Sequence, residues 1–417
     1  MAARHPGIFP TFFLSGFECS TFLWKDGRRR DLVAETHHRE HARRDYEVLR
    51  ELGIAVAREG IPWPMADRGG GRYDFGMVAP MVAAMREFHI TPIWDLCHYG
   101  YPDDVDPFDQ ERFSERFAAY CRAVARHVGG ELPGPHFFTP INEITFFAFC
   151  GGEWGWAAPY GKDRETRERF RVALCRAAIA GVRAIREVLP DARMMHVDPL
   201  VHVVPPADRP DLKEAAEHET FVDTYLAWDI LCGKAHPELG GTPEILDIVG
   251  VNNYSFGQME YREQGPHQAL PPGHPGIVPL CDLLRRVWER YRRPMVIGET
   301  SGLGRGRPDW LRDVMQEAMA AVNQGMDLHG VCLFPAVDMP DWHTGEWLHN
   351  GICDLVDCEG VLQRVPHEPY VAELRRWQKE LNRVTRLDED PSSDPVDLQD
   401  VIDGARRLAP RPDSNWH

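Results

Sequence analysis

The segment HFFTPINEITFFAF, residues 136–149, is an apolar and aromatic run that carries two polar side chains, Asn142 and Glu143, at its centre. A short run of this kind is typical of a strand that is buried on both faces. Taking a carboxylate out of water is costly unless the group is paired or holds a proton. The segment therefore predicts a buried strand that ends at a functional acid.

Seven further apolar runs occur along the chain, and turn residues and an amphipathic segment follow each of them. Their spacing leaves room for one helix after each strand. The eight predicted strands are residues 11–17, 53–59, 90–97, 136–142, 192–198, 246–252, 293–299 and 330–336.

The segments between these strands have the period of a helix. In residues 109–128, for example, Phe113, Phe117 and Val124 fall on one face and charged residues on the other. Eight strands that alternate with helices predict a (β/α)8 TIM barrel of the α/β class. A doubly wound nucleotide-binding sheet is disfavoured, because no GxGxxG motif opens a helix and GLGRGR at 302–307 lacks the GK[ST] of a phosphate-binding loop.

Composition narrows the possible partners. The chain has 417 residues and a formal net charge of −17, which disfavours nucleic acid and anionic membranes as partners. We see no secretory signal and no apolar stretch of the roughly 18 residues needed to span a bilayer. The ten cysteines include no CxxC pair, so a zinc ribbon or a disulfide scaffold is not expected. These features predict a cytoplasmic protein and leave its oligomeric state open.

The composition changes near the C-terminus. The segment LDEDPSSDPVDLQD is acidic, contains proline and serine, and has no aromatic residue. We expect residues 1–384 to form the barrel and residues 385–417 to form an acidic, flexible tail.

In a (β/α)8 barrel the functional side chains gather at the C-terminal ends of the strands. Polar residues follow the predicted strands at these positions. We expect Glu59 to be a structural acid paired with an arginine. The remaining candidates are Arg58, His98, Asn142, Glu143, Asn252, Tyr254, Glu299, Asp338, Asp341 and Trp342.

Two of these candidates, Glu143 and Glu299, are carboxylates on different strands of one rim. Cleavage of a glycosidic bond needs one protonated acid for the leaving oxygen and one ionised carboxylate for the anomeric carbon. A neighbouring arginine and tyrosine keep the second group ionised, while burial and its negative charge raise the pKa of the first. Trp154, Trp156 and Trp342 offer flat apolar faces to sugar rings.

The order and spacing of these motifs resemble those of glycoside hydrolase family 1, the β-glucosidase type of (β/α)8 enzyme, over about residues 10–380. FLSGFECS resembles the opening FLWG-x-x-x-S, and LCHYGYP resembles L-Y-H-W-D-L-P. TPINEI resembles T-x-N-E-P, GVNNY resembles G-V-N-Y-Y, and VIGETSG takes the place of I-T-E-N-G. LFPAVDMPDW stands where the family has V-W-S-L-x-D-N-F-E-W.

The resemblance implies a retaining β-glycosidase that acts on a small β-glycoside without a cofactor or a metal. It implies that Glu143 is the acid/base and Glu299 the nucleophile. It implies substrate contacts for Arg58, which also braces the nucleophile, and for His98, Asn142, Asn252, Tyr254, Asp341 and Trp342.

The chain departs from the family pattern in the half of the site that, in the family, binds the distal hydroxyl groups of the sugar. Leu23 stands near the position of the family's glutamine, Phe334 replaces a tryptophan, and Asp341 is shorter than the family's glutamate. We therefore do not expect ordinary glucose specificity. Replacement contacts are expected from Glu18, Asp95 and His343.

Two other functions remain open from the sequence. A metal-dependent hydrolase barrel could use His196, Asp198 and His202, which lie near the fifth strand. A barrel without catalytic activity could bind a carbohydrate or a partner protein. His37 and His41 have the spacing of metal ligands on a helix, but an exposed loop is the favoured interpretation.

Overall fold

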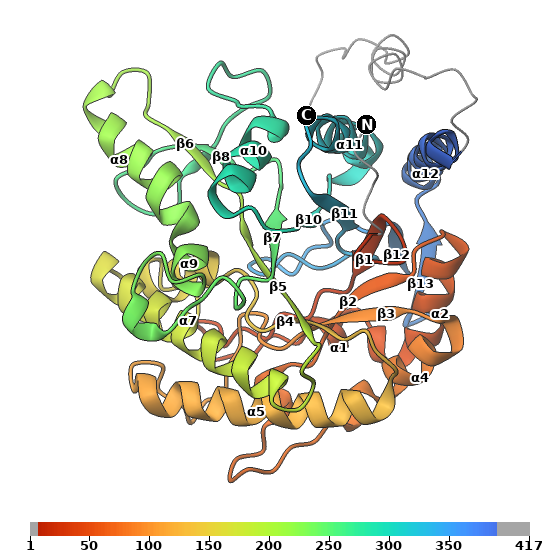
Figure 1. The fold of residues 1–417 in the computed structure, drawn as a ribbon, viewed down its shortest axis with the longest axis horizontal. Helices are drawn as coiled ribbons and strands as arrows, with labels where there is room; N and C mark the ends of the chain where they lie inside the picture. The colour runs from red at the N-terminus through yellow and green to blue at the C-terminus, as the bar shows by residue number, and fades with distance from the viewer. Residues whose placement is uncertain (1–6, 390–417) are drawn as a thin grey trace.

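The computed structural model describes residues 7–389, and its main feature is a closed barrel of eight parallel strands. The strands follow one another around the barrel in the order β1-β11-β10-β7-β5-β4-β3-β2 (Figure 1). Their bounds are β1 Phe13–Gly16, β2 Val56–Gly60, β3 Thr91–Asp95, β4 Phe137–Thr139, β5 Arg193–Pro199, β7 Ile248–Asn252, β10 Met295–Thr300 and β11 Leu328–Leu333. The eight predicted strands are confirmed, and so is the (β/α)8 fold.

Helices surround the barrel and cover its outer face (Figure 1). The longer helices are α2 His38–Glu51, α4 Ala79–Phe88, α5 Gln110–Glu131, α7 Arg164–Arg186, α9 Thr224–Leu231, α10 Leu280–Tyr291, α11 Arg307–Asn323 and α12 Glu368–Glu389. The shorter helices are α1 Leu32–Glu35, α3 Trp63–Ala66, α6 Ile144–Ala148 and α8 Lys213–His218. No helix of residues 7–389 combines the length and the apolarity needed to cross a bilayer.

The sequence shows why α5 and α7 form where they do. Asp109 and Asp163 are the N-cap residues, and each side chain accepts a hydrogen bond from a backbone N–H in the first turn. The apolar faces of the two helices pack against each other outside the barrel. The buried residues of α5 include Phe113, Phe117 and Val124, the face that the helical period predicts.

Each strand contributes an apolar side chain to one layer of the barrel interior. This inner layer consists of Leu14, Val56, Ile93, Phe137, Met195, Ile248, Val296 and Cys332. Successive side chains of a strand point to opposite faces, so the residue two positions later also points inward. Arg58 and Asp95 occupy such positions on β2 and β3, directly above the apolar layer.

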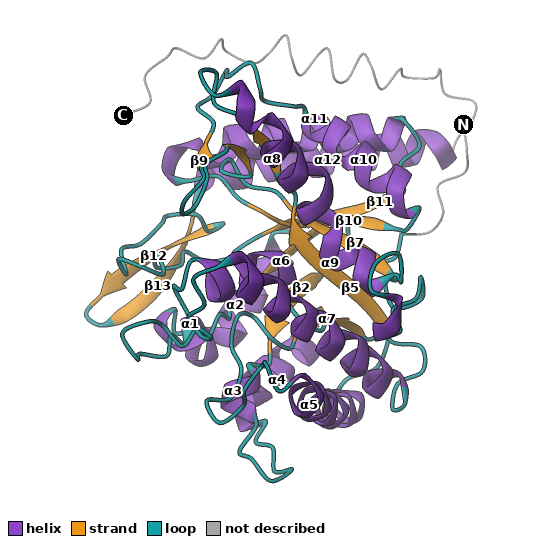
Figure 2. Cartoon of the chain, turned by 90° about the vertical axis from the view of Figure 1, so that its left-hand side faces the viewer, coloured by secondary structure: helices purple, strands orange, loops and turns teal. Residues whose placement is uncertain are grey.

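Two small sheets that the sequence analysis did not predict lie outside the barrel. The hairpin of β12 Cys353–Cys358 and β13 Val361–Pro366 projects from one side (Figure 2). The other sheet contains β6 His202–Val204, β8 Gln258–Glu260 and β9 Gln268–Ala269.

The helix α12 continues across the predicted boundary at residues 384 and 385 and ends at Glu389. Residues 390–417, most of the predicted acidic tail, lie outside the described residues. The two-part division of the chain therefore stays a prediction.

Candidate active site

A cavity of about 390 Å³ opens at the C-terminal ends of the barrel strands. Its volume is in the range of small-molecule sites. Eight of the predicted site residues line it: Glu18, His98, Glu143, Asn252, Tyr254, Glu299, Asp341 and Trp342. Two more, Arg58 and Asn142, are buried and are joined to the lining residues by hydrogen bonds. The structure thus brings together these ten residues, although their roles remain predictions. The candidate Asp338 does not line the cavity, and it accepts from the backbone N–H groups of Gly351 and Leu355 instead.

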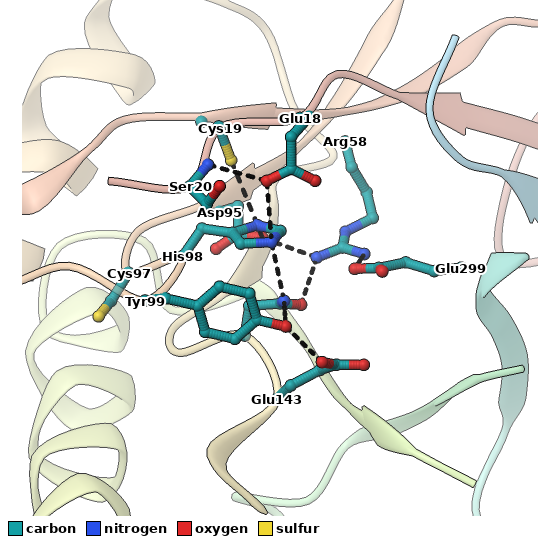
Figure 3. Close-up of polar contacts among 12 residues, drawn as sticks. Glu18, Cys19, Ser20, Arg58, Asp95, Cys97, His98, Tyr99, Glu143 and Glu299 are labelled. Carbon is teal, nitrogen blue, oxygen red and sulfur yellow. Dashed lines mark hydrogen bonds and ion pairs between the residues drawn. The ribbon is translucent and has the colours of Figure 1, made fainter. Parts of the chain in front are cut away.

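The carboxylate of Glu299 is held by a cation. Arg58 donates to Oε1 of Glu299 (Figure 3). The hydroxyl of Tyr254 donates to Oε2 at 3.0 Å. Arg58 is fully buried and also donates to Asp95 at 2.6 Å and to Oδ1 of Asn142 at 2.7 Å. Two donors from different segments of the chain thus hold the side chain of Glu299 in place.

Gly16 provides the space that Arg58 needs. A Cβ atom at Gly16 would lie 2.9 Å from Cβ of Arg58 and 2.8 Å from the ring of Phe334. The guanidinium lies over that ring at 5.2 Å. The glycine at the end of β1 therefore leaves room for Arg58 to reach Glu299.

The carboxyl group of Glu143 has the opposite environment. Its oxygens accept hydrogen bonds from Tyr99 and, at 2.8 Å, from Asn252, and no cation contacts it among the described residues. Burial raises the pKa of Glu143 to about 8, and the negative charge of Glu299 acts in the same direction. Glu143 therefore holds a proton at neutral pH while Glu299 is paired with Arg58.

The backbone of Glu143 is in the left-handed region, with φ 42° and ψ 63°. Residues other than glycine adopt this conformation at a cost, and such residues are enriched at functional sites. The residue lies in the turn between β4 and α6, at the N-cap position of α6, and this turn directs its side chain into the cavity.

The raised pKa of Glu143 predicts a pH-dependent loss of stability. An ordinary glutamate ionises near pH 4.5, whereas Glu143 keeps its proton to about pH 8. Between these values the folded state binds more protons than the unfolded state. The free energy of unfolding therefore falls as the pH rises, by at most about 1.4 kcal/mol per pH unit.

Glu143→Gln removes this titration. Urea unfolding at about pH 5 and about pH 8 should show that the variant gains stability over the wild type as the pH rises. Glu346→Gln, at an exposed glutamate, is the matched control and should show no such gain. If Glu143→Gln and the wild type have the same pH dependence, Glu143 does not hold a proton in the fold.

His98 lies at the other side of the cavity among several polar groups (Figure 3). Its Nδ1 is 3.1 Å from Asp95 and 3.4 Å from the thiol of Cys19, and its Nε2 is 3.5 Å from Glu18. Glu18 lines the cavity and accepts from the backbone of Ser20 at 3.0 Å. Glu18 is therefore placed to contact a ligand, whereas Asp95 lies behind Arg58 and His98.

The aromatic candidates are divided between the cavity and its surroundings. Trp154 and Trp342 line the cavity, and the buried indole Nε1 of Trp342 has no hydrogen-bond partner in the described structure. Trp156 packs on Trp154 at 4.7 Å and does not line the cavity. His343 packs on Trp156 and is likewise not among the lining residues, so the expected sugar contact from His343 is not supported.

Asp341 lines the cavity, but one of its oxygens is already occupied. Oδ1 accepts from the backbone N–H groups of His343 and Thr344, at 2.9 and 2.7 Å. The shorter side chain thus stabilises its own loop as well as facing the cavity.

The prediction that Glu59 pairs with an arginine was wrong. Glu59 accepts from Nε2 of His38 at 2.8 Å and from the hydroxyl of Tyr46, and all three groups are buried. His38 also contacts Asp45 at 2.7 Å. Histidine at this position forms a buried network that no strand or helix pattern predicts.

The residues proposed for a metal-dependent hydrolase do not come together. Nε2 of His196 lies 3.0 Å from the backbone oxygen of Ile245, and Asp198 accepts from Thr145. Two groups in the described part of the chain are compact enough to hold a metal ion, and neither contains His196, Asp198 or His202. They are Cys19, Asp95 and His98, and Asp338, His349 and Asp354. In the first, the guanidinium of Arg58 already occupies Asp95.

Tyr99, whose hydroxyl donates to Glu143, was not predicted from the sequence as a site residue. Two π-helical turns that contribute to the cavity wall, Phe149–Glu153 and Glu219–Asp223, were also not predicted. The motif HYGYP contains a signal for Tyr99, because Tyr99 stands where the family has tryptophan. A single sequence contains no comparable signal for the π-helical turns.

The chain is similar to several known proteins. No family model matches the chain. The chain is 23% identical to the aryl-phospho-β-D-glucosidase BglC of Bacillus subtilis, over 83% of this chain and 91% of that protein. It is 22% identical to β-glucosidase A of Thermotoga maritima, over 79% and 83% of the two chains.

The fold is also similar to solved β-glucosidase structures. The structure of a Thermotoga maritima β-glucosidase in complex with glucoimidazole superposes with a TM-score of 0.73 at 19% identity, and the match covers 89% of this chain and 99% of that one. This similarity establishes the fold, a (β/α)8 barrel. The chain is a distant homologue of the family 1 β-glucosidases, and the resemblance drawn from its motifs is confirmed.

Proposed function

We propose that the protein is a retaining β-glycosidase that hydrolyses a small β-glycoside by double displacement. The observation that supports this proposal best is the contrast between two carboxyl groups of one cavity. Glu299 is paired with Arg58 and Tyr254, whereas burial and the charge of Glu299 keep Glu143 protonated. These are the states that a nucleophile and a general acid require.

In the first step Glu299 attacks the anomeric carbon, and the bond between that carbon and the leaving oxygen breaks. Glu143 donates its proton to the leaving oxygen. In the second step the ionised Glu143 removes a proton from water, which attacks the anomeric carbon and releases Glu299. Each step inverts the configuration at the anomeric carbon, so after two steps the product has the configuration of the substrate. Retention requires carboxyl groups about 5 to 5.5 Å apart.

The substrate should be a glycoside without a phosphate group. Six carboxyl groups line the cavity, and its described lining contains no lysine or arginine. The lining acids are Glu18, Glu143, Glu219, Asp223, Glu299 and Asp341. A lining with several acids and no lysine or arginine disfavours a dianionic phosphate group. The name of the Bacillus relative suggests a phosphorylated substrate for that protein, whereas the lining of this cavity disfavours one.

This difference can be measured directly. For any aryl β-glycoside that the protein hydrolyses, we expect the 6-phosphorylated form to have a kcat/KM at least about 100-fold lower. The BglC protein of Bacillus subtilis is the matched control in the same assay. A preference of this protein for the phosphorylated form would contradict the assignment.

The proposed activity is tested by a panel of aryl β-glycosides that differ in the sugar, assayed with the wild type and with Glu299→Gln. Hydrolysis by the wild type alone supports the proposal. A barrel without catalytic activity would bind panel members in calorimetry without hydrolysing any. A metal-dependent hydrolase would lose its activity to a chelator, which should have no effect here.

A further inference from the structure

Tyr99 occupies an unusual position in the site. It stands where the family motif has tryptophan, it is only 2% exposed, and its backbone is in the left-handed region with φ 62°. Its ring is stacked on Phe22 at 4.8 Å and packs edge-on against Trp342 at 5.7 Å. The side chain therefore has little freedom, and its hydroxyl points at Glu143 (Figure 3).

The hydrogen bonds around this hydroxyl have a fixed direction. Arg58 can only donate, so Oδ1 of Asn142 accepts from it and Nδ2 of Asn142 is the end that donates. Nδ2 of Asn142 lies 3.1 Å from the hydroxyl oxygen of Tyr99. Because that oxygen accepts from Asn142, its own proton is directed to Oε2 of Glu143.

The two oxygens of Glu143 are thus not equivalent. Oε2 is an acceptor of the Tyr99 hydroxyl, whereas Oε1 faces the side-chain amide of Asn252 at 2.8 Å. The oxygen of that amide is buried and has no partner within the described structure. An amide can present either end, and if it turns, Oδ1 of Asn252 accepts a proton held on Oε1.

We infer that Tyr99 is a positioning residue that reserves Oε2 of Glu143 as an acceptor, so that Oε1 is the oxygen that gives and takes the proton. This inference rests on the proposed function. In the first step the O–H bond at Oε1 breaks, its electron pair stays on Glu143, and the proton moves to the leaving oxygen. In the second step Oε1 takes a proton from the attacking water. Tyr99 keeps its own proton throughout.

Several groups act on the same carboxyl group. Glu299 and Asp198 are the charged neighbours that raise the pKa of Glu143, and Glu18 lines the same cavity. The hydrogen bonds from Tyr99 and Asn252 lower it. Removing the hydroxyl of Tyr99 leaves the neighbouring charges in place and removes one of these two donors.

The test is Tyr99→Phe, which keeps the ring and removes the hydroxyl. The protein is labelled with ¹³C at the glutamate carboxyl groups for NMR, and Glu143→Gln assigns the Glu143 signal. In Tyr99→Phe the midpoint of the pH titration of Glu143 should rise by about one pH unit. For glycosides with poor leaving groups kcat should fall by about 10- to 100-fold with little change in KM. Tyr120→Phe is the matched control, because it loses a buried hydrogen bond to the backbone of Ile61 and should leave the midpoint unchanged.

An unchanged midpoint of Glu143 in Tyr99→Phe would overturn the inference. If this variant does not fold, ¹³Cζ-labelled tyrosine in the wild type gives the answer: the Tyr99 signal should follow the titration of Glu143 and lose that response in Glu143→Gln. The titrations need no substrate. A shifted midpoint in a protein that hydrolyses no glycoside would therefore refute the proposed function alone, and hydrolysis with an unshifted midpoint would refute the role of Tyr99 alone.

Discussion

Glu299→Gly should lower kcat for an activated aryl β-glycoside by at least about 10⁴-fold, which corresponds to about 5 kcal/mol of activation free energy. The substitution removes the group that attacks the anomeric carbon, and Arg58 and Tyr254 lose their contacts with it. Azide can enter the vacated space and attack in place of Glu299. It should restore part of the activity and give the α-glycosyl azide, since only one inversion then occurs.

Glu143→Gly is the matched control for the azide experiment. In that variant Glu299 still forms the covalent intermediate, and azide then replaces water in the second step. The product should be the β-glycosyl azide, with retained configuration. If azide gave the β-product with Glu299→Gly, the roles of the two acids would have to be exchanged.

Glu143→Gln should lower activity to an extent that depends on the leaving group. For glycosides whose leaving group needs a proton, we expect kcat/KM to fall by about 10²- to 10⁴-fold, the usual contribution of a general acid. Dinitrophenyl glycosides leave without a proton, so their first step should be nearly unchanged. Stopped-flow measurement should then show a fast release of the phenol followed by a slow steady state.

The role of Glu143 as general acid also predicts how kcat/KM depends on pH. Because Glu143 must be protonated in the first step and its pKa is about 8, kcat/KM of the wild type should fall above about pH 8. That alkaline decline should be absent in Glu143→Gln. An equal loss of activity for good and poor leaving groups would show that Glu143 is not the general acid.

The barrel could be predicted from the sequence because its signals are local and repeated. Each strand is a short apolar run, and each long helix has a periodic apolar face, as Phe113, Phe117 and Val124 show on α5. The C-terminal ends of parallel strands meet at one rim, so Asn142, Glu143 and Glu299 could be brought together without coordinates. The identity of the polar candidates followed from this rule and from the family motifs.

What could not be predicted depends on contacts between distant segments. The partner of Glu59 is His38, from a helix 21 residues earlier, because the histidine fits between Glu59 and Asp45. The hydroxyl of Tyr99 turns toward Glu143 because aromatic rings from other segments fix its ring. Side-chain direction in a crowded core is a property of packing, which one sequence does not reveal.

The most direct test of the central claim is to trap the intermediate. A 2-deoxy-2-fluoro glycoside with an activated leaving group, made with the sugar that the protein hydrolyses best, slows the second step more than the first. Intact-mass and peptide analysis should find one glycosyl group per chain, attached to Glu299, and the adduct should decay as activity returns. Turnover of the parent glycoside without any adduct, or an adduct on a residue other than Glu299, would contradict the account.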